Sequence, residues 1–120
     1  MATKNQKISK AMQIAWHKAN ALCFNGKLPR PAFRVKTLEK EEALALWHMV
    51  GEKQIITVDP DAVKNPIFLI RLMLHEMIHQ LQWQQKSERT KREQHGRFFR
   101  RHADRIEAQT GLHVYWVKYY

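Results

Sequence analysis

The 120-residue chain is 44% hydrophobic and 27% charged, which is typical of one globular domain and excludes a second core or a disordered chain. It has no run of about eighteen apolar residues and one cysteine, Cys23, which excludes a membrane-spanning helix, an intramolecular disulfide and a cysteine-based zinc ribbon. The net charge of +10 favours a polyanionic partner, nucleic acid before an anionic membrane surface. We expect a single domain over residues 1–120, with residues 1–5 flexible, in a reducing cytoplasm.

The first predicted element is an amphipathic helix over residues 6–24. Its apolar side chains recur at intervals of three and four residues, as one stripe of a 3.6-residue period does. These positions are Ile8, Met12, Ala15, Trp16, Ala19, Leu22 and Cys23. Asn25-Gly26 is a suitable end for the helix, and the two prolines within residues 28–31 make the next segment a rigid connector.

Strands are predicted after the connector. Residues 32–38 alternate apolar and polar side chains, which is typical of a strand. Residues 43–50 fit a helix or a strand, but the Gly-Glu pair that follows them favours a hairpin turn. We therefore interpret residues 43–58 as a β-hairpin whose second arm is rich in β-branched side chains.

Asn65 and Pro66 open the next predicted helix, because asparagine suits the N-cap and proline suits the first helical position. From Ile67 to Leu74 the sequence is apolar nearly all round, which indicates a helix buried in the middle of the domain. We expect this helix to end near Gln85.

A charged, loop-like segment at residues 86–94 leads to a third predicted helix over residues 96–110, which Gly111 ends. The tail, residues 112–120, alternates well enough to predict a last strand. The order αβββααβ belongs to the α+β class, with three helices against a small mixed or antiparallel sheet of three or four strands.

The central helix carries the pattern H-E-x-x-H at residues 75–79. Four residues are a little more than one helical turn, so His75 and His79 project from one face and can hold one metal ion. Glu76 reaches beside the metal, where its carboxylate can accept a proton from water. Apolar residues flank the motif on both sides, and ionisable groups in a buried helix need a compensating charge. This context favours a metal ligand set over a solvated pair of histidines.

A catalytic zinc ion usually has three protein ligands, so a third must come from elsewhere in the chain. His95 is the best candidate, because residues 86–94 are long enough to return the chain to the metal and Gly96 permits close backbone approach. His102 lies two turns further on the same face, and we expect it either to support the ligands from outside or to be packed. The competing third ligands are His102, Glu107 and, less well, Asp104.

The tryptophans near the motif have different expected places. Trp47 and His48 would line the cleft if the edge strand of the hairpin binds an extended peptide. Trp83 lies one turn beyond His79, and we expect it to pack under the loop that returns to the metal.

The basic residues are concentrated in two parts of the chain. Residues 1–38 hold eight basic side chains and no acidic one, and residues 86–105 hold eight basic against three acidic ones. Such clusters are typical of nucleic-acid contact surfaces. From the second cluster we predict contacts to DNA by Lys91, Arg92, Arg97, Arg100 and Arg101.

Three segments give the chain a resemblance to a known family, and it covers about residues 12–117. They are FNGKLP at 24–29, HEMIH at 75–79 and REQHGRFFRRHADRIEAQTGLHV at 92–114. The chain resembles the SprT-like zinc metalloprotease family, which includes bacterial SprT proteins and Spartan, a DNA-dependent protease that cleaves DNA–protein crosslinks. In that family the third histidine lies in an H-G-x-x-F block, which here is residues 95–99.

The resemblance implies a minimal zincin-like fold, with one zinc ion on His75, His79 and His95 and with Glu76 as the general base. Bacterial SprT proteins typically carry a zinc ribbon, and Spartan carries DNA-binding and partner-recruiting segments. This chain shows neither, so we expect any DNA contact to come from the core domain itself.

These features together predict a zinc endopeptidase for proteins that are bound or crosslinked to DNA. It would be cytoplasmic, associated with the nucleoid in a bacterium or phage, or nuclear in a eukaryote, and it would have no membrane partner. Two alternatives stay open: a nucleic-acid-binding protein with a structural zinc, and a protease of soluble proteins that needs no DNA. The intact Glu76 argues against a structural zinc, whereas a fourth protein ligand such as His102 would favour it.

Overall fold

The computed structural model describes residues 2–41, 43–63, 65–85 and 95–115. Within these ranges the chain forms three α-helices, a short 3₁₀ helix and a three-stranded mixed sheet, which confirms the α+β class. The elements are α1 (Lys4–Cys23), β1 (Ala32–Val35), β2 (Ala45–Val50), β3 (Lys53–Val58), η1 (Pro60–Ala62), α2 (Pro66–Gln84) and α3 (Arg97–Thr110).

The sheet has the strand order β1-β3-β2, so β3 is central and β2 is an edge strand within the described part of the chain. β2 and β3 form the predicted antiparallel hairpin, with Ala45 opposite Val58, and Gly51 makes the turn with a φ of 60°. β1 pairs parallel with β3. From Ile55 onward β3 is buried on both faces, which fits its central place.

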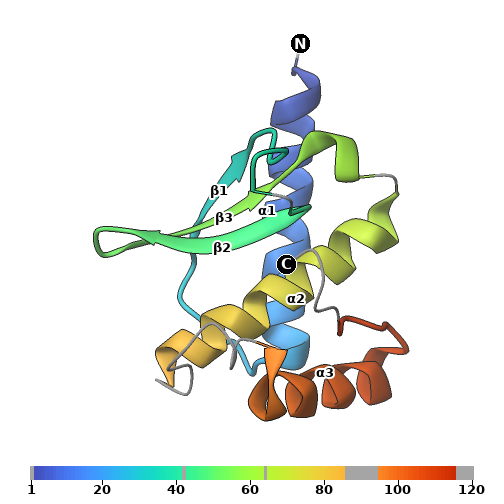
Figure 1. Ribbon diagram of the computed structural model, residues 1–120. Helices are drawn as coiled ribbons and strands as arrows, with labels where there is room; N and C mark the ends of the chain where they lie inside the picture. Colours follow the sequence, from blue (N-terminus) through green and yellow to red (C-terminus); the bar gives the residue numbers. More distant parts are fainter. Residues whose placement is uncertain (1, 42, 64, 86–94, 116–120) are drawn as a thin grey trace.

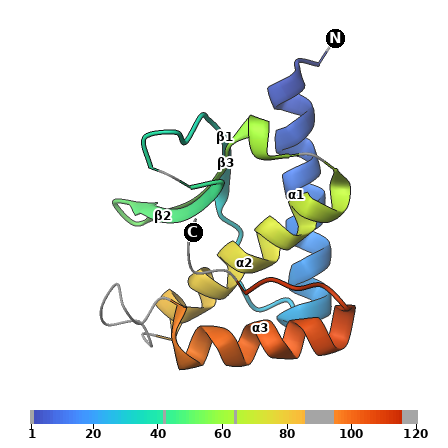
Figure 2. The same ribbon diagram turned by 45° about the vertical axis from the view of Figure 1, so that its right-hand side comes forward.

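Helix α2 crosses the middle of the molecule, with the sheet on one side of it and α3 on the other (Figures 1 and 2). It begins as predicted: the Asn65 side chain accepts a hydrogen bond of 2.8 Å from the Phe68 amide, and Pro66 occupies the first turn. Every residue from Leu72 to Gln80 is buried. The H-E-x-x-H residues therefore lie in the core and not on a surface helix.

Helix α1 crosses α2 and packs against it and against β1 (Figure 1). The buried Trp16 indole donates a hydrogen bond of 3.3 Å to Oε1 of Gln80, and the Gln80 amide donates one of 2.6 Å to the Pro29 carbonyl. Both polar ends of this buried glutamine are thus satisfied. The contacts join α1, the proline connector and α2, and they fix the helix that carries the histidines.

The structure departs from the sequence predictions at both ends. Helix α1 begins at Lys4, two residues early, because Thr3 and Gln6 form a reciprocal capping box. The predicted flexibility of residues 1–5 stays a prediction, although Lys4 and Asn5 are helical. Residues 112–115 are not in a strand, so the predicted last strand is wrong there, and residues 116–120 lie outside the described ranges, as does the loop at 86–94.

No helix in the described ranges combines the length and the hydropathy that crossing a membrane requires.

Candidate metal centre

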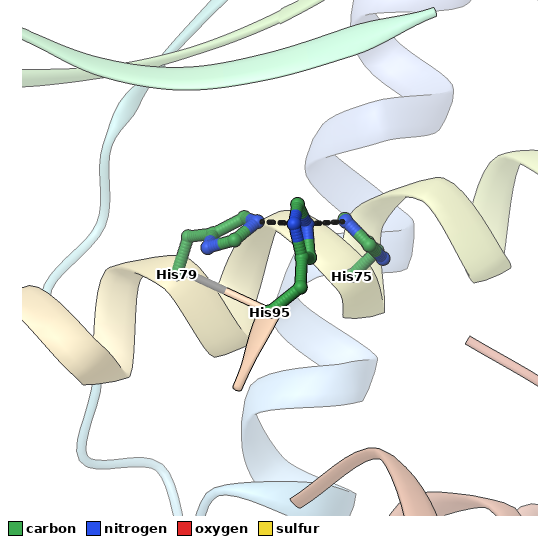
Figure 3. Close-up of side chains that lie close together, drawn as sticks. All are labelled: His75, His79 and His95. Atoms are coloured by element: carbon green, nitrogen blue, oxygen red, sulfur yellow. Dashed lines mark hydrogen bonds between the residues drawn. The ribbon is translucent and has the colours of Figure 1, made fainter. Parts of the chain in front are cut away.

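Three histidine side chains converge on one point beside α2 (Figure 3). His75 and His79 lie one turn apart on α2, and His95 comes from the segment just before α3. The Nε2 atom of His95 is 3.2 Å from Nε2 of His75 and 3.2 Å from Nε2 of His79. The structure therefore brings together the three histidines that the sequence predicted as ligands.

The separations of the His95 nitrogen from the other two fit a tetrahedral zinc ion, and all three ligand atoms lie within 4.8 Å of one another. With zinc–nitrogen bonds of about 2.0–2.1 Å, two imidazoles at the tetrahedral angle have nitrogens about 3.3 Å apart. The observed 3.2 Å is close to this value. A divalent ion would replace the unfavourable approach of three nitrogen lone pairs with three coordinate bonds, so the donor set fits zinc.

Two hydrogen bonds orient the ligands on α2. Nδ1 of His75 donates to the Val114 carbonyl at 2.6 Å, and Nδ1 of His79 donates to Oε1 of Gln82 at 2.8 Å. A proton on Nδ1 leaves the lone pair of a neutral imidazole on Nε2. Both rings are therefore fixed in the tautomer that presents a free electron pair to a metal.

Burial keeps the three imidazoles neutral. It lowers the pKa of His75 well below the ordinary value, and it lowers that of His79 to about 4 against the opposing effect of the Gln82 hydrogen bond. Burial also lowers the pKa of His95. Near neutral pH the imidazoles of His75 and His79 therefore keep a free lone pair on Nε2, and the lowered pKa of His95 favours the neutral ring that a metal ligand requires.

Phe99 forms a hydrophobic floor under all three rings. Its ring centroid lies 4.6 Å from that of His75, 4.8 Å from that of His79 and 5.0 Å from that of His95, and it is fully buried. The hydroxyl of Tyr115 donates a hydrogen bond of 2.8 Å to the His95 carbonyl and holds the backbone of the third ligand. This packing gives a physical reason for the phenylalanine of the H-G-x-x-F block, which in this chain is Phe99.

Glu76 lies next to the first ligand and is tied to the sheet by one oxygen. Its Oε1 accepts a hydrogen bond of 2.8 Å from the Trp47 amide of edge strand β2. Among the described residues, the buried Oε2 has no hydrogen-bond partner. Burial raises the pKa of Glu76 to about 8, partly offset by the Trp47 hydrogen bond. A cation on the neighbouring histidines would favour the carboxylate and lower this pKa.

The edge strand β2 places one tryptophan against α2. Trp47 contacts Trp83 of α2, with ring centroids 6.0 Å apart, and Trp83 is about half exposed. His48 is the next residue on β2 and points to the opposite sheet face. There burial, followed by the charges of Arg34 and Lys36, lowers its pKa. Trp47 thus lies on the side of β2 that faces α2, whereas His48 lies on the other. That they line a peptide cleft stays a prediction, and the loop expected over Trp83 lies outside the described residues.

The competing ligands are held elsewhere in the structure. Nδ1 of His102 accepts hydrogen bonds from Arg105 at 3.2 and 3.3 Å, and its ring packs on Phe98. Glu107 bonds to His113 at 2.7 Å. In the described ranges the ligand group consists of the three predicted histidines, without either competitor or Asp104. The groups that support the ligands His75 and His79 by hydrogen bonds are the Val114 carbonyl and the Gln82 side chain, and His102 is packed on Phe98 instead.

Three of the five predicted DNA contacts are described, and they lie on the outer surface of α3. Arg97, Arg100 and Arg101 are exposed, and the guanidinium groups of Arg100 and Arg101 stack on Tyr115 and Phe98. Lys91 and Arg92 lie outside the described residues. The three described arginines follow His95 directly along the chain and place positive charge near the metal centre.

Sequence reasoning missed several groups that support the site. Gln82 stands three residues after His79, a spacing at which helical side chains meet, so its role was open to prediction. The Val114 carbonyl and the Trp47 amide are backbone groups, and no residue type marks them in a sequence.

Comparison with known proteins agrees with this arrangement. A search of curated protein sequences gives no match to this chain. The SprT-like family model matches residues 12–117, nearly the whole chain, and spans all three histidines together with Glu76. The chain therefore belongs to the SprT-like family, which is commonly a metalloprotease-like domain.

Proposed function

We propose that this protein is a zinc-dependent endopeptidase in which Glu76 is the general base. The observation that carries the proposal is the convergence of three neutral Nε2 atoms beside a buried carboxylate that has one bonded and one unbonded oxygen. A purely structural site needs no such carboxylate. Membership of the SprT-like family supports the same assignment.

A zinc ion held by three imidazoles would supply Lewis-acid activation of water and of a substrate carbonyl. The protein supplies the proton chemistry. The Trp47 amide holds Oε1 of Glu76 in place, so that Oε2 can take a proton from the attacking water. Glu76 then delivers this proton to the amine that leaves when the peptide bond breaks.

The edge strand β2 gives a place for the substrate chain. Strand order leaves one side of β2 unpaired within the described residues, and the Trp47 amide on that side points to Glu76. An extended peptide that adds to this edge would lie beside α2, with its backbone close to the base. The Trp47–Trp83 pair would contact its side chains.

We further propose that the substrates are proteins bound or crosslinked to DNA. The net charge of +10 and the exposed arginines of α3 support this step, because a phosphate backbone would meet positive charge close to the metal centre. A protease of soluble proteins is the alternative, and it predicts the same chemistry without any effect of DNA.

The test is to load the protein with one equivalent of zinc and incubate it with a DNA-binding protein substrate, with and without single-stranded DNA. We expect cleavage that requires zinc, stops with a chelator, returns on zinc addition and is faster with DNA. Equal cleavage rates with and without DNA would favour the soluble-protein alternative. Stoichiometric zinc without cleavage of any substrate would favour a structural zinc.

A further inference from the structure

A groove away from the metal-binding histidines lies on α1, on the side that faces the start of α2. Two hollows of about 410 and 370 Å³ share Ala11, Val63 and Leu69, so they form one continuous groove. The described residues that line these two hollows do not include His75, Glu76, His79 or His95. An occupant of the groove would therefore leave the metal centre open.

One wall of the groove is a single stripe of α1. Its members recur at intervals of three and four residues, which is the spacing of a helix-packing seam. They are Lys4, Lys7, Ile8, Ala11, Ile14, Ala15 and Lys18. The middle of the stripe is apolar, with Ile14 about half exposed, and its two alanines allow close approach of a partner backbone. Both ends carry lysine.

The other wall comes from the segment that leads into α2 and from its first turns. Val63, Pro66, Leu69 and Ile70 give this wall an apolar surface. The charged side chains that line the groove are three lysines, and the described lining residues include no carboxylate. The groove therefore combines an apolar floor with a positive rim.

We propose that this groove docks an amphipathic helix of another protein, with apolar anchors flanked by aspartate or glutamate. From Lys4 to Lys18 the stripe is about 21 Å long, which matches about four turns of a partner helix. Helices that lie in grooves insert anchors at i, i+3, i+4 and i+7, and acidic flanks would meet the lysines at both ends.

The shape and charge of the groove disfavour two other occupants. A second copy of this chain that docked through the same stripe would bring its own lysines against these lysines. A membrane surface suits a protruding apolar face, whereas this one is hollowed between two helices. The inference concerns partner recruitment and goes beyond the proposed protease activity.

The experiment is a binding titration on the full-length, isotope-labelled protein. The probes are helical peptides with leucine, isoleucine or phenylalanine at heptad-spaced positions and glutamate around them, with matched peptides that carry lysine in place of glutamate. We expect acidic peptides to bind, with NMR shift changes in α1 and around residues 63–70, and affinity to fall as salt rises. The lysine peptides should not bind.

Two substitutions on the same helix give a matched pair. Ile14→Glu places a charge in the groove and should weaken peptide binding by about tenfold or more. Leu22→Glu adds the same charge at a position that is also exposed but lies outside this groove, and binding should stay within about twofold of wild type. Both variants should retain stoichiometric zinc, which reports an intact fold without any cleavage assay.

Three outcomes would overturn the proposal. One is that no acidic peptide in the panel binds, and another is that the two substitutions weaken binding equally. The third is binding to phosphatidylserine vesicles, abolished by Ile14→Glu, without any peptide binding, which would identify a membrane surface instead. Because none of these readouts involves proteolysis, failure here is distinguishable from failure of the proposed enzyme activity.

Discussion

At the scale of single residues, two adjacent phenylalanines differ in their contact with the metal centre. Phe99 contacts all three ligand rings, whereas Phe98 packs on His102. Phe99→Leu should lower zinc affinity by about 10–100-fold, as changes around metal ligands typically do. Phe98→Leu is the control and should change it little. A competition titration with a chelating dye measures the zinc affinity of both variants. Equal zinc affinities for Phe99→Leu and Phe98→Leu would show that the contact of Phe99 with the ligand rings does not contribute to zinc binding.

The raised pKa of Glu76 should give the zinc-depleted protein an unusual dependence of stability on pH. Its folded pKa of about 8 lies above its ordinary value of 4.5, so between these pH values the folded chain holds a proton that the unfolded chain has lost. Its contribution to stability is therefore present below pH 4.5 and is lost as pH rises toward 8.

The substitution Glu76→Gln removes the titrating carboxyl group. The histidines are present in both proteins, so their titration cancels in the comparison. The free energy of unfolding of the variant, minus that of wild type, should therefore increase from pH 4.5 to 8, by up to a few kcal/mol. Urea denaturation in the presence of a chelator measures it. A difference that is independent of pH would mean that Glu76 is ionised in the folded chain throughout this range.

At the scale of elements, Asn20 connects the end of α1 to the connector. This buried side chain accepts from the Leu28 amide and donates to the Leu28 carbonyl, both at 3.1 Å. Asn20→Ala should cost about 1–3 kcal/mol of unfolding free energy, because two buried backbone groups lose their partners. Asn5→Ala, on the exposed start of α1, is the control. Equal denaturation midpoints for the two variants would refute this role.

The helices and the hairpin were predictable because local patterns specify them. The 3.6-residue stripe, the Asn65-Pro66 start and the β-branched arm each depend on neighbouring residues. The conformation of the tail was not predictable in this way. Its alternation of apolar and polar side chains reflects which residues are buried, and residues 112–115 form no strand. Val114 is fully buried and gives its carbonyl to His75, a contact between residues far apart in sequence.

The candidate site divides in the same way. Helical spacing placed His75 and His79 together, and the loop length with Gly96 made His95 reachable. The supporting groups depend on tertiary structure: the Trp47 amide reaches Glu76 only because β2 lies at the sheet edge above α2.

At the scale of the whole molecule, charge should govern association with DNA. If about five phosphates are neutralised, log K should fall against log salt with a slope of about −4.5 for duplexes and about −3.5 for single strands. Reversing Arg97, Arg100 and Arg101 to glutamate should weaken binding and reduce the slope while zinc stays bound. Fluorescence anisotropy at several salt concentrations gives both quantities.

Reversal of Lys7, Lys10 and Lys18 on α1 changes the net charge equally and serves as the control. An equal loss of DNA affinity in both triple variants would mean that overall charge, and not the surface of α3, carries the binding. A flat salt response in the wild type would remove DNA from the account.

The central claim is that Glu76 supplies the base for peptide hydrolysis. The most direct test compares wild type with Glu76→Gln for three properties: zinc content, DNA affinity and the rate of substrate cleavage. Glutamine keeps the shape of glutamate and can still accept from the Trp47 amide, so zinc and DNA binding should be retained. Cleavage should fall by a factor of about 10²–10⁴, because glutamine cannot take the proton from the attacking water. Equal cleavage rates for the two proteins would contradict the mechanism.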